Sequence, residues 1–374
     1  MGKSINVGII GAGWMGKVHS EGYRRIPISF DLGGAEVHLR YAADVEAPLA
    51  KDLAGRYGYE KWTADWREVV RDKAVNLVDV CVPNFLHKEI VIEAARAGKH
   101  IICEKPLSNS PADSREMIEA VEKAGVKHRI DFNYRKVPAI SYVKSMIESG
   151  ELGSVSFYRA FIGQDWGYKA GATKTWRFES SQSGGGSLVT MGSHVIDIGR
   201  HFLGDVTEVM ASSWTDPVRT KGPQVVDDAM ALSLKFESGA IGSVISNWLA
   251  HGRKHHFEFE VNSEKASILF NSERLNELDA AFGSDEEAKQ GFRTIYIGQP
   301  HPYGSDFELK TGMGIGIKES FLIQFYEFGR SILEDRPSGP NFYDGLFVDE
   351  VIEKAYRSVR SGQWEKIPKV SAKK

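Results

Sequence analysis

Three glycines near the N-terminus have the spacing of a phosphate-binding turn. Gly11, Gly13 and Gly16 follow the apolar run Val7 to Ile10 and precede a stretch that can be helical. In such a turn the first glycine allows a tight bend, the second lets backbone amides approach a pyrophosphate, and the third lets the helix pack closely. The helix N-terminus adds positive potential for the phosphates. An ordinary glycine turn is the alternative, but the flanking strand and helix favour a dinucleotide site.

Asp44 closes the next expected strand, Glu36 to Ala43. An acidic residue at this point accepts hydrogen bonds from the hydroxyl groups of the adenosine ribose, and it repels a 2′-phosphate. The sequence therefore favours NAD over NADP. The segment between the glycines and Asp44 is longer than usual, with an extra loop around Phe30 to Gly34, and an aspartate in a surface turn is the alternative.

Lys105 stands between the end of an expected strand, His100 to Cys103, and Pro106. Ligands of parallel α/β sheets bind outside the carboxyl ends of the strands, which is where this lysine falls. An ammonium group there can hold a substrate oxygen and stabilise the alkoxide that develops as a hydride leaves. A solvated loop lysine is the alternative.

His194 lies on an expected helix that follows three consecutive glycines, Gly184 to Gly186. These glycines either let the backbone approach a ligand or form a flexible link. A histidine can take up a hydroxyl proton near neutral pH. Thr190 and Asp197 share the expected helix face with it, at i−4 and i+3. A histidine buried for packing alone is the alternative.

Aromatic and basic side chains occur on either side of this helix. Flat sugar faces stack on aromatic rings, but core packing explains any single ring equally well. The basic run indicates a solvated surface patch, with an anionic sugar site as the other possibility. Its histidines do not have the spacing of a standard metal site, so no metal is expected. The aromatic residues are Trp166, Tyr168, Trp176 and Phe178, and the basic ones are Arg177, His251, Arg253, Lys254, His255 and His256.

The first third of the chain alternates strands and helices, which predicts a doubly wound parallel sheet of the Rossmann type. The remaining strands follow one another with hairpin-like separators, which predicts an α+β domain with a large open, mainly antiparallel sheet. The boundary falls near Asp131 to Pro138, giving domains 1–132 and 133–374. The expected helices are 15–25, stopped by Pro27, then 48–58, 87–97, 111–124, 318–333 and 345–359. Further strands are expected at 77–82, 154–164, 207–214, 229–236, 240–247, 256–262 and 266–271. Phe321, Phe325, Phe328 and Ile332 form a stripe that indicates a core-facing helix.

The bulk composition is that of an ordinary globular protein. Its 374 residues are 42% hydrophobic and 26% charged, with a formal net charge of -3, which attracts neither nucleic acid nor an anionic membrane. Cys81 and Cys103 lie in apolar strand-like runs, so we expect buried, reduced thiols and a cytoplasmic protein; an exposed redox pair is the alternative. No signal-peptide pattern and no run of transmembrane length is recognisable.

Two longer segments carry a family resemblance. CVPNFLHKEIVIEAARAGKHIICEKPLS and SGGGSLVTMGSHVIDIGRHFLG resemble the Gfo/Idh/MocA family, the glucose–fructose oxidoreductase and inositol dehydrogenase group. TWRF, NWLAHGR, GFRTIY and HPYG are most similar to the branch that contains levoglucosan dehydrogenase. The resemblance implies a Rossmann domain, a second domain whose open sheet often mediates dimers or tetramers, and hydride transfer between a sugar or cyclitol carbinol and a nicotinamide.

Carried onto this sequence, the resemblance implies the site residues. Lys105, His194 and Asp197 are the expected catalytic residues. The expected cofactor contacts are Gly11, Gly13, Trp14, Met15, Gly16, Asp44, Pro83, Asn84, His87, Glu104 and Lys105, and the expected substrate contacts are Tyr134, Arg135, Trp166, Trp176, Arg177, Thr190, His194 and His251. The family's dehydrogenases usually carry aspartate where this chain has Thr190, and Asp197 is expected to take over part of that role.

The expected function is NAD-dependent oxidation of a secondary ring hydroxyl, with C3 as a candidate position, in a sugar, anhydrosugar, glycoside or cyclitol. Thr190 keeps a second enzyme class open, an NAD-dependent glycosidase that oxidises, eliminates and re-reduces, on a neutral or an anionic sugar. A non-catalytic NAD and sugar sensor is a third class, which the presence of both Lys105 and His194 disfavours. The expected partners are a small sugar or glycoside and further copies of the chain, in a homo-dimer or homo-tetramer.

Overall fold

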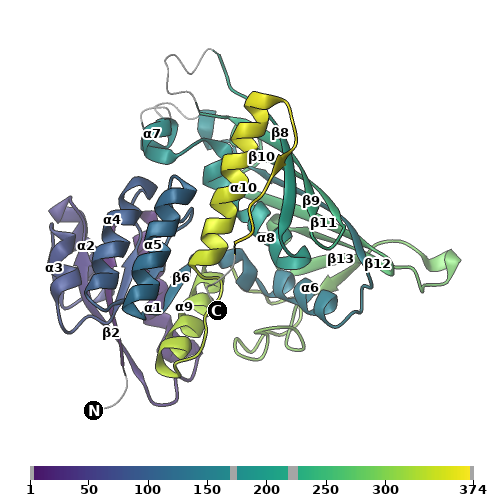
Figure 1. Cartoon of the computed structure of the whole chain (residues 1–374). Coiled ribbons are helices and arrows are strands. Elements are labelled where there is room, and N and C mark those ends of the chain that lie inside the picture. Colours follow the sequence, from purple (N-terminus) through teal and green to yellow (C-terminus); the bar gives the residue numbers. More distant parts are fainter. Residues whose placement is uncertain (1–3, 169–174, 218–225, 371–374) are drawn as a thin grey trace. The chain divides into compact units, whose positions relative to one another are not determined.

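The computed structural model describes residues 4–168, 175–217 and 226–370. Contacts within the chain divide it into two compact units. The first combines the described residues up to Asn133 with Ile317–Phe347, and the second combines those of Tyr134–Gly316 with Val348–Val370 (Figure 1). Segment 317–347, which the sequence analysis assigns to the second domain, therefore groups with the first unit.

The first unit contains a six-stranded sheet in which all neighbouring strands are parallel. The order β3-β2-β1-β4-β5-β6 is that of a doubly wound dinucleotide-binding sheet. The predicted Rossmann sheet is confirmed. Its strands are β1 (Ser4–Ile10), β2 (Glu36–Ala43), β3 (Lys61–Thr63), β4 (Leu77–Val80), β5 (His100–Cys103) and β6 (His128–Ile130). The sequence pattern does not indicate β3 or β6, because strands of three residues are too short to show a period.

Helices flank this sheet, and one of them comes from the far end of the chain (Figure 1). They are α1 (Trp14–Ser29), α2 (Ala47–Tyr57), α3 (Trp66–Arg71), α4 (His87–Arg96), α5 (Pro111–Ala124) and α9 (Ile317–Leu333). α9 packs on α1, where the ring of Phe325 stacks on Tyr23 with centroids 4.5 Å apart. A Cβ at Gly22 would lie 2.8 Å from that phenyl ring, so the absence of a side chain allows the two helices to approach. The predicted apolar stripe is buried at Phe321, Phe325 and Phe328 and half-buried at Ile332.

Helix α1 does not stop before Pro27, as the sequence pattern predicts, but continues through it to Ser29. A proline inside a helix removes one hydrogen bond to the residue four positions earlier. Pro27 falls in the last turn, where little helix remains to be disrupted, and the backbone N–H of Phe30 still donates to the carbonyl of Ile26 at 2.9 Å.

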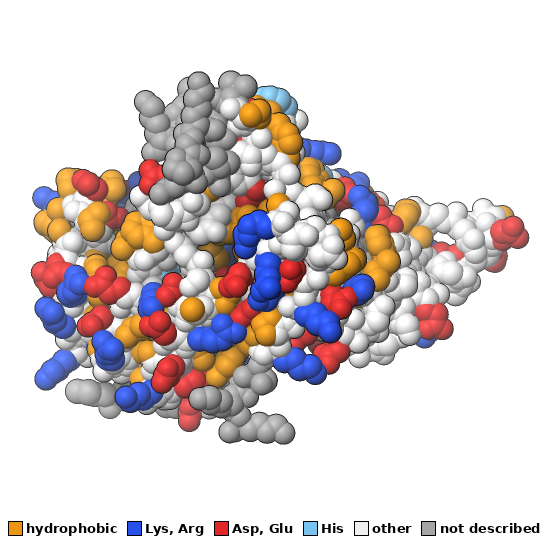
Figure 2. All heavy atoms as spheres, turned by 45° about the horizontal axis from the view of Figure 1, so that its top comes forward, with side chains coloured by type: hydrophobic (Ala, Val, Ile, Leu, Met, Phe, Trp, Pro, Cys, Tyr) orange, Lys and Arg blue, Asp and Glu red, His pale blue; other side chains and the backbone are white. Residues whose placement is uncertain are grey.

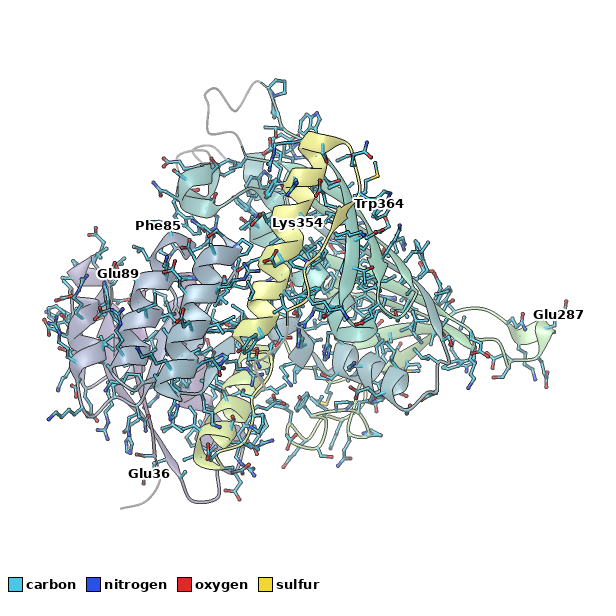
Figure 3. All side chains as sticks on the ribbon, viewed as in Figure 1. Glu36, Phe85, Glu89, Glu287, Lys354 and Trp364 are labelled. Carbon is cyan, nitrogen blue, oxygen red and sulfur yellow. The ribbon has the colours of Figure 1, made fainter. Side chains whose placement is uncertain are left out.

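The second unit contains a nine-stranded sheet in the order β14-β13-β12-β11-β7-β10-β9-β8-β15. Neighbours are antiparallel except β7 and β10, which are parallel, so the expected mainly antiparallel sheet is confirmed with one parallel pair. Its strands are β7 (Val155–Gly163), β8 (Val206–Trp214), β9 (Ala229–Phe236), β10 (Ile241–Asn247), β11 (His256–Ser263), β12 (Ala266–Asn271), β13 (Glu277–Phe282), β14 (Arg293–Tyr296) and β15 (Glu365–Lys366). Glu287, labelled in Figure 3, lies in the connection between β13 and β14.

One face of this sheet is buried and the other carries exposed side chains. Along β7, Tyr158, Ala160 and Ile162 are buried, whereas Arg159 is exposed and pairs with Glu258 and Glu260 of β11. The helices of the unit are α6 (Pro138–Glu148), α7 (Ser180–Ser183), a π-helical segment η6 (Leu188–Gly192), α8 (Ser193–Leu203) and the later part of α10 (Phe342–Ser361). The carbonyl of Val195 in α8 accepts a 2.9 Å hydrogen bond from the buried Tyr158 hydroxyl, so α8 lies on the buried face.

Charges of both signs are interspersed over the molecular face that Figure 2 shows. This mixture agrees with the near-neutral formal charge of -3. Across residues 4–168, 175–217 and 226–370, no helix combines the length and the hydropathy needed to cross a membrane.

Candidate functional site

The glycine turn of the first unit is shaped by close backbone packing at two positions and by open space at a third. Gly11 has φ +105°, and a Cβ there would lie 2.5 Å from the carbonyl oxygen of Cys81. A Cβ at Gly16 would lie 2.0 Å from the carbonyl oxygen of Gly11. Around Gly13, the residue that caps α1, nothing lies within 4 Å of the Cβ position. The first and third glycines therefore hold the turn together, while the second leaves room for a ligand.

The carboxylate of Asp44 lies directly beside this turn. One of its oxygens accepts a 2.7 Å hydrogen bond from the backbone N–H of Ala12, and the other accepts a 2.9 Å bond from the N–H of Glu46. The long loop after α1 therefore does not move the end of β2 away from the glycines. Each carboxylate oxygen has a second lone pair, so Asp44 can also accept hydrogen bonds from ribose hydroxyls.

The N-terminus of α1 suits an anionic ligand. Its own first turn contains no acidic side chain that would repel an anion from the positive end of the helix dipole. Trp14 is 67% exposed and Met15 is half-buried, which leaves both side chains able to contact a ligand. The open cradle at Gly13 and the carboxylate beside it fit the diphosphate and the ribose of NAD.

The turn that carries Lys105 is held by a buried carboxylate and a buried histidine. The backbone N–H of Lys105 donates to Oε2 of Glu104 at 3.2 Å. The imidazole of His87 lies between Val82, whose carbonyl is 2.9 Å from Nε2, and Pro106, whose carbonyl is 3.1 Å from Nδ1. His87 thus joins the ends of β4 and β5, and burial lowers its pKa.

The neighbouring turn before α4 contains the remaining expected cofactor contacts. Pro83 is half-buried and the side chain of Asn84 is 6% exposed, whereas Phe85 in the same turn is 43% exposed (Figure 3). His87 stays a predicted cofactor contact, and its ring lies between the carbonyls of Val82 and Pro106. Its observed contacts are those of a group that positions the two turns.

In the second unit, two of the three glycines before η6, Gly185 and Gly186, pack against protein groups. A Cβ at Gly186 would lie 1.9 Å from the backbone carbonyl oxygen of Asp227, and one at Gly185 would lie 2.1 Å from the hydroxyl of Tyr356. The Asp227 carboxylate accepts hydrogen bonds at 2.9 Å from the N–H groups of Gly186 and Leu188. Sequence reasoning missed Asp227, whose only signal is an acidic pair just before a strand.

Thr190, His194 and Asp197 do not lie on one regular α-helix. Thr190 belongs to the π-helical segment η6, and α8 begins at Ser193. A π turn adds a residue to the helical repeat, which shifts the face that Thr190 presents relative to His194. His194 is half-buried, and its ring meets Tyr134 edge-on with centroids 4.8 Å apart.

Asp197 forms a bidentate ion pair with Arg135. The guanidinium Nε and Nη2 donate to the two carboxylate oxygens at 2.8 and 2.6 Å, and Asp197 is 1% exposed. A carboxylate held this way is a weak proton acceptor, because the guanidinium stabilises its charged form. The pair fixes the residue after Tyr134 to α8, a contact that sequence separation hides.

Tyr134 connects His194 to a second histidine. The tyrosine hydroxyl lies 2.6 Å from Nε2 of His255, and Nε2 of Gln164 lies 2.9 Å from Nδ1 of the same ring. Burial raises the pKa of Tyr134, so the phenol keeps its proton. Sequence reasoning placed His255 only in a basic run and did not find Gln164.

The aromatic and basic residues of the second unit divide into core and surface groups. Trp166 packs on the fully buried Trp248, with centroids 5.0 Å apart, which is core packing. Trp176 is half-buried beneath the guanidinium of Arg177, 4.5 Å from the ring centroid. His251 stacks on Tyr168 at 4.1 Å. In the basic run, Arg253 pairs with Glu273 and Lys254 with Asp165, so acidic neighbours offset much of its charge.

Comparisons with known proteins agree with this architecture. Residues 5–132 match the model of the oxidoreductase family with an NAD-binding Rossmann fold, and residues 140–269 match the GFO/IDH/MocA C-terminal domain. The chain belongs to the Gfo/Idh/MocA family of NAD-binding oxidoreductases. The expected family, fold class and cofactor are therefore confirmed.

Two curated relatives and a solved structure extend over nearly the whole chain. Levoglucosan dehydrogenase of Pseudarthrobacter phenanthrenivorans is 38% identical, over 99% of this chain and 100% of the relative. Myo-inositol 2-dehydrogenase of Thermotoga maritima is 27% identical, over 97% of this chain and 99% of the relative. A solved structure of levoglucosan dehydrogenase in complex with NADH and levoglucosan has a TM-score of 0.94 and 38% identity, covering 98% of this chain and 100% of that one.

The two glycines Gly13 and Gly16 give a matched test of the cofactor turn. Gly13→Ala should keep the melting temperature, because nothing lies near its Cβ and its φ of -68° suits alanine, but it should weaken NAD binding. The expected loss is about tenfold, or about 1.4 kcal/mol. Gly16→Ala should lower both NAD affinity and stability, since its Cβ meets the Gly11 carbonyl. Calorimetric titration and thermal unfolding measure the two effects; equal loss of stability in both variants would contradict the geometry.

Asp44 predicts a preference for NAD over NADP, because its carboxylate repels a 2′-phosphate. Asp44→Ser keeps an acceptor for the Ala12 N–H but removes the charge, so the preference should narrow or reverse. Titrating both cofactors into wild type and variant measures it. Asp52→Ser, on the exposed surface of α2, is the control and should keep the preference. Tighter binding of NADP than of NAD by the wild type would show that Asp44 does not face the 2′ position of the adenosine ribose.

Proposed function

We propose that this protein is an NAD-dependent dehydrogenase that oxidises a secondary ring hydroxyl of a sugar, anhydrosugar, glycoside or cyclitol, with C3 as the candidate carbon. The observation that carries the proposal is the arrangement of the first unit. The glycine turn follows β1 and Lys105 follows β5, so both lie at the carboxyl edge of one parallel sheet. The full-length likeness to levoglucosan dehydrogenase supports a small cyclic polyol as the substrate.

The proposed chemistry divides between a cation and a base. Bound NAD supplies a hydride acceptor. Lys105 holds the substrate oxygen and stabilises the negative charge that develops on it. His194 accepts the hydroxyl proton, so that one proton and one hydride leave the carbinol and a ketone remains. Asp197 acts through its ion pair with Arg135 and positions this part of α8, instead of replacing the carboxylate that Thr190 lacks.

The proposed substrate contacts come from the second unit. Tyr134, Arg135 and Thr190 offer hydroxyl and guanidinium groups to ring hydroxyls, and His194 offers a proton acceptor. Trp176, Arg177 and His251 add stacking surfaces and donors. Trp166 packs on Trp248, so its role is to support the other contact residues. A neutral sugar suits this set better than an anionic one, because the nearby basic run is paired with Glu273 and Asp165.

The catalytic prediction concerns Lys105. Lys105→Ala should reduce kcat/KM by about 10² or more, because a group that stabilises the developing alkoxide is lost. NAD affinity should change only a few-fold. Lys127→Ala removes a lysine that pairs with Asp335 in the same unit and should leave turnover near the wild-type value. The assay follows NADH with levoglucosan, inositols and a glycoside panel.

The same assay separates the two enzyme classes. A dehydrogenase accumulates NADH in step with a ketosugar. A glycosidase of this type releases free aglycone and reducing sugar at constant NADH and incorporates deuterium from heavy water next to the oxidised carbon. These products would show that the protein is the glycosidase and not the dehydrogenase. Substantial activity in Lys105→Ala would show that this lysine is not catalytic.

We also propose that the chain forms a homo-dimer or homo-tetramer through the exposed face of its nine-stranded sheet. Met210, Ile241 and Ile245 are 38%, 54% and 41% exposed there, and Trp364 stands beside the sheet under the Lys235 ammonium (Figure 3). Water-exposed apolar side chains on one face of a sheet, here on β8 and β10, favour association. Light scattering should give a multiple of 41.6 kDa, and Ile245→Asp should shift the mass toward one chain while Ile28→Asp should not. A monomeric wild type would overturn this proposal.

A further inference from the structure

A fully buried histidine in the first unit is surrounded by three carboxyl groups. Nδ1 of His19, on α1, lies 2.9 Å from Asp79 of β4. Its Nε2 lies 3.1 Å from Glu104, which follows β5, and 2.8 Å from Asp131, which follows β6. His19 and Asp79 are 0% exposed, Asp131 is 1% and Glu104 is 8% exposed. We call these four residues the His19 cluster.

The geometry of the His19 cluster favours bound protons. Glu104 Oε1 and Asp131 Oδ2 both lie against Nε2 of His19, at 3.1 and 2.8 Å, and the two carboxyl groups bring oxygens within 4.8 Å of each other. Two buried carboxyl groups this close hold a proton between them, because like charges side by side disfavour ionisation of both. Both ring nitrogens of His19 face carboxyl oxygens, which is the arrangement of an imidazolium. Burial alone lowers the pKa of His19, but the charges of Asp79 and Asp131 outweigh it and hold this pKa well above the usual value.

A metal ion is the other possible occupant of such a group. Within the described residues, His19 with Asp79 and Cys81, and His19 with Glu104 and Asp131, bring ligand atoms within 4.8 Å of one another. Both ring nitrogens of His19 lie 2.8 to 3.1 Å from carboxyl oxygens, which is the spacing of direct hydrogen bonds to the imidazole. The contacts of the His19 cluster therefore favour protons as its occupants.

The His19 cluster is connected to both halves of the cofactor edge. Glu104 contacts His19 through Oε1 and accepts the backbone N–H of Lys105 at Oε2. His19 follows Gly16 by three residues, inside the helix that starts at the glycine turn. The backbone N–H of Asp131 donates to the carbonyl of Cys103 at 2.9 Å, which fixes the ends of β5 and β6 together. Gln324 of α9 donates to the Asp131 carboxyl from the other side.

We propose that His19, Glu104 and Asp131 are positioning residues that hold the Lys105 turn in place against α1. The proton shared by Glu104 and Asp131 keeps these two carboxyl groups together and so maintains the position of the turn. This rests on the proposed role of Lys105 in hydride transfer. None of the three residues is proposed to touch substrate. Their effect reaches the reaction through the backbone of Lys105.

The shared proton gives the His19 cluster a pH dependence. Burial and the charge of Glu104 raise the pKa of Asp131 to about 7. Above that pH the pair loses its proton, and two negative charges face each other without a hydrogen between them. The titratable groups that interact with His19 are Tyr23 on α1, Tyr59 beyond α2, Asp79 of β4 and Cys81 after it, and Glu104 and Asp131, which follow β5 and β6. Cys103 and Lys105 interact with Glu104. From α9 come the neutral Gln324, which donates to Asp131, and two phenyl rings that contact His19.

Three variants test the proposal. Asp131→Asn replaces the shared proton with a permanent N–H donor, and His19→Gln removes the cation. His128→Gln is the control. It removes a histidine from β6, the strand just before Asp131, and the partners of His128 are Glu122 and the N–H of Phe342. The readouts are kcat and KM for NAD from about pH 5 to about pH 9, which brackets a carboxyl group raised to neutrality, together with NAD affinity and the infrared band of a protonated carboxyl group.

The wild type should show one protonated carboxyl band that disappears near neutral pH, together with a fall in kcat over the same range. Asp131→Asn should lose that band and that fall, with little change in KM for NAD. His19→Gln should lower kcat by about tenfold to a hundredfold, since a misplaced group costs rate without costing affinity. His128→Gln should keep the wild-type band and profile.

Other outcomes would overturn the proposal. They are a carboxyl band that persists in Asp131→Asn, an unchanged pH profile in that variant, or one bound metal ion per chain in the purified protein. The infrared titration needs no turnover, so it judges the His19 cluster even if His19→Gln fails to fold. If no polyol is oxidised but the band titrates as expected, the proposed function fails and the shared proton stands without its catalytic role.

Discussion

The backbone of Gly16 lies so close to the carbonyl of Gly11 that no side chain fits between them. This contact fixes the point at which α1 begins, and the contacts of the cofactor turn and of the His19 cluster depend on that point. The free N–H groups of the helix face open space at Gly13, and Asp44 reaches the N–H of Ala12. Three residues further along α1, His19 enters the buried carboxyl cluster. A shift in the start of the helix would disturb all of these contacts at once.

Buried charge gives the first unit its second constraint. Taking an imidazolium and several carboxyl groups out of water is costly unless each group is paired and hydrogen-bonded. The His19 cluster pairs its charges by combining residues of α1 and β4 with those that follow β5 and β6. α9 does more than cover an apolar face, because Gln324 donates to one oxygen of Asp131 while Phe325 packs beside His19. A helix from the end of the chain completes an arrangement whose other members come from the first 131 residues.

The second unit uses similar means around η6 and α8. Asp227 binds the N–H groups of Gly186 and Leu188, which lets the chain enter an irregular helix while its backbone remains satisfied. The Arg135–Asp197 pair fixes the segment after Tyr134 to α8. Tyr134 then lies against both His194 and His255, as a protonated phenol in contact with two imidazoles. Thr190 sits in the π-helical segment, so the loss of a carboxylate there coincides with a local change in helix geometry.

Features encoded by neighbouring residues were predictable. Helix α5 has the predicted bounds, since Ser110 caps it, Pro111 starts it and Gly125 ends it in the left-handed region. The end of β2 just before Asp44 and the glycine turn were likewise visible as local patterns.

Features that depend on distant residues were not predictable. The bidentate pair joins residues 62 positions apart, and Tyr134 and His255 are 121 positions apart. The stripe on α9 shows which face is buried but not that α1 covers it. The continuation of α1 past Pro27 depends on how little helix follows the proline.

Transfer of a labelled hydride tests the account most directly. Wild-type protein with NAD would be mixed with a ring polyol that carries deuterium at the carbon to be oxidised. The account predicts that NADH appears more slowly than with the unlabelled polyol, and that the NADH formed contains that deuterium at the nicotinamide ring. NADH without deuterium, or a ketone formed without NADH, would contradict direct hydride transfer at this site.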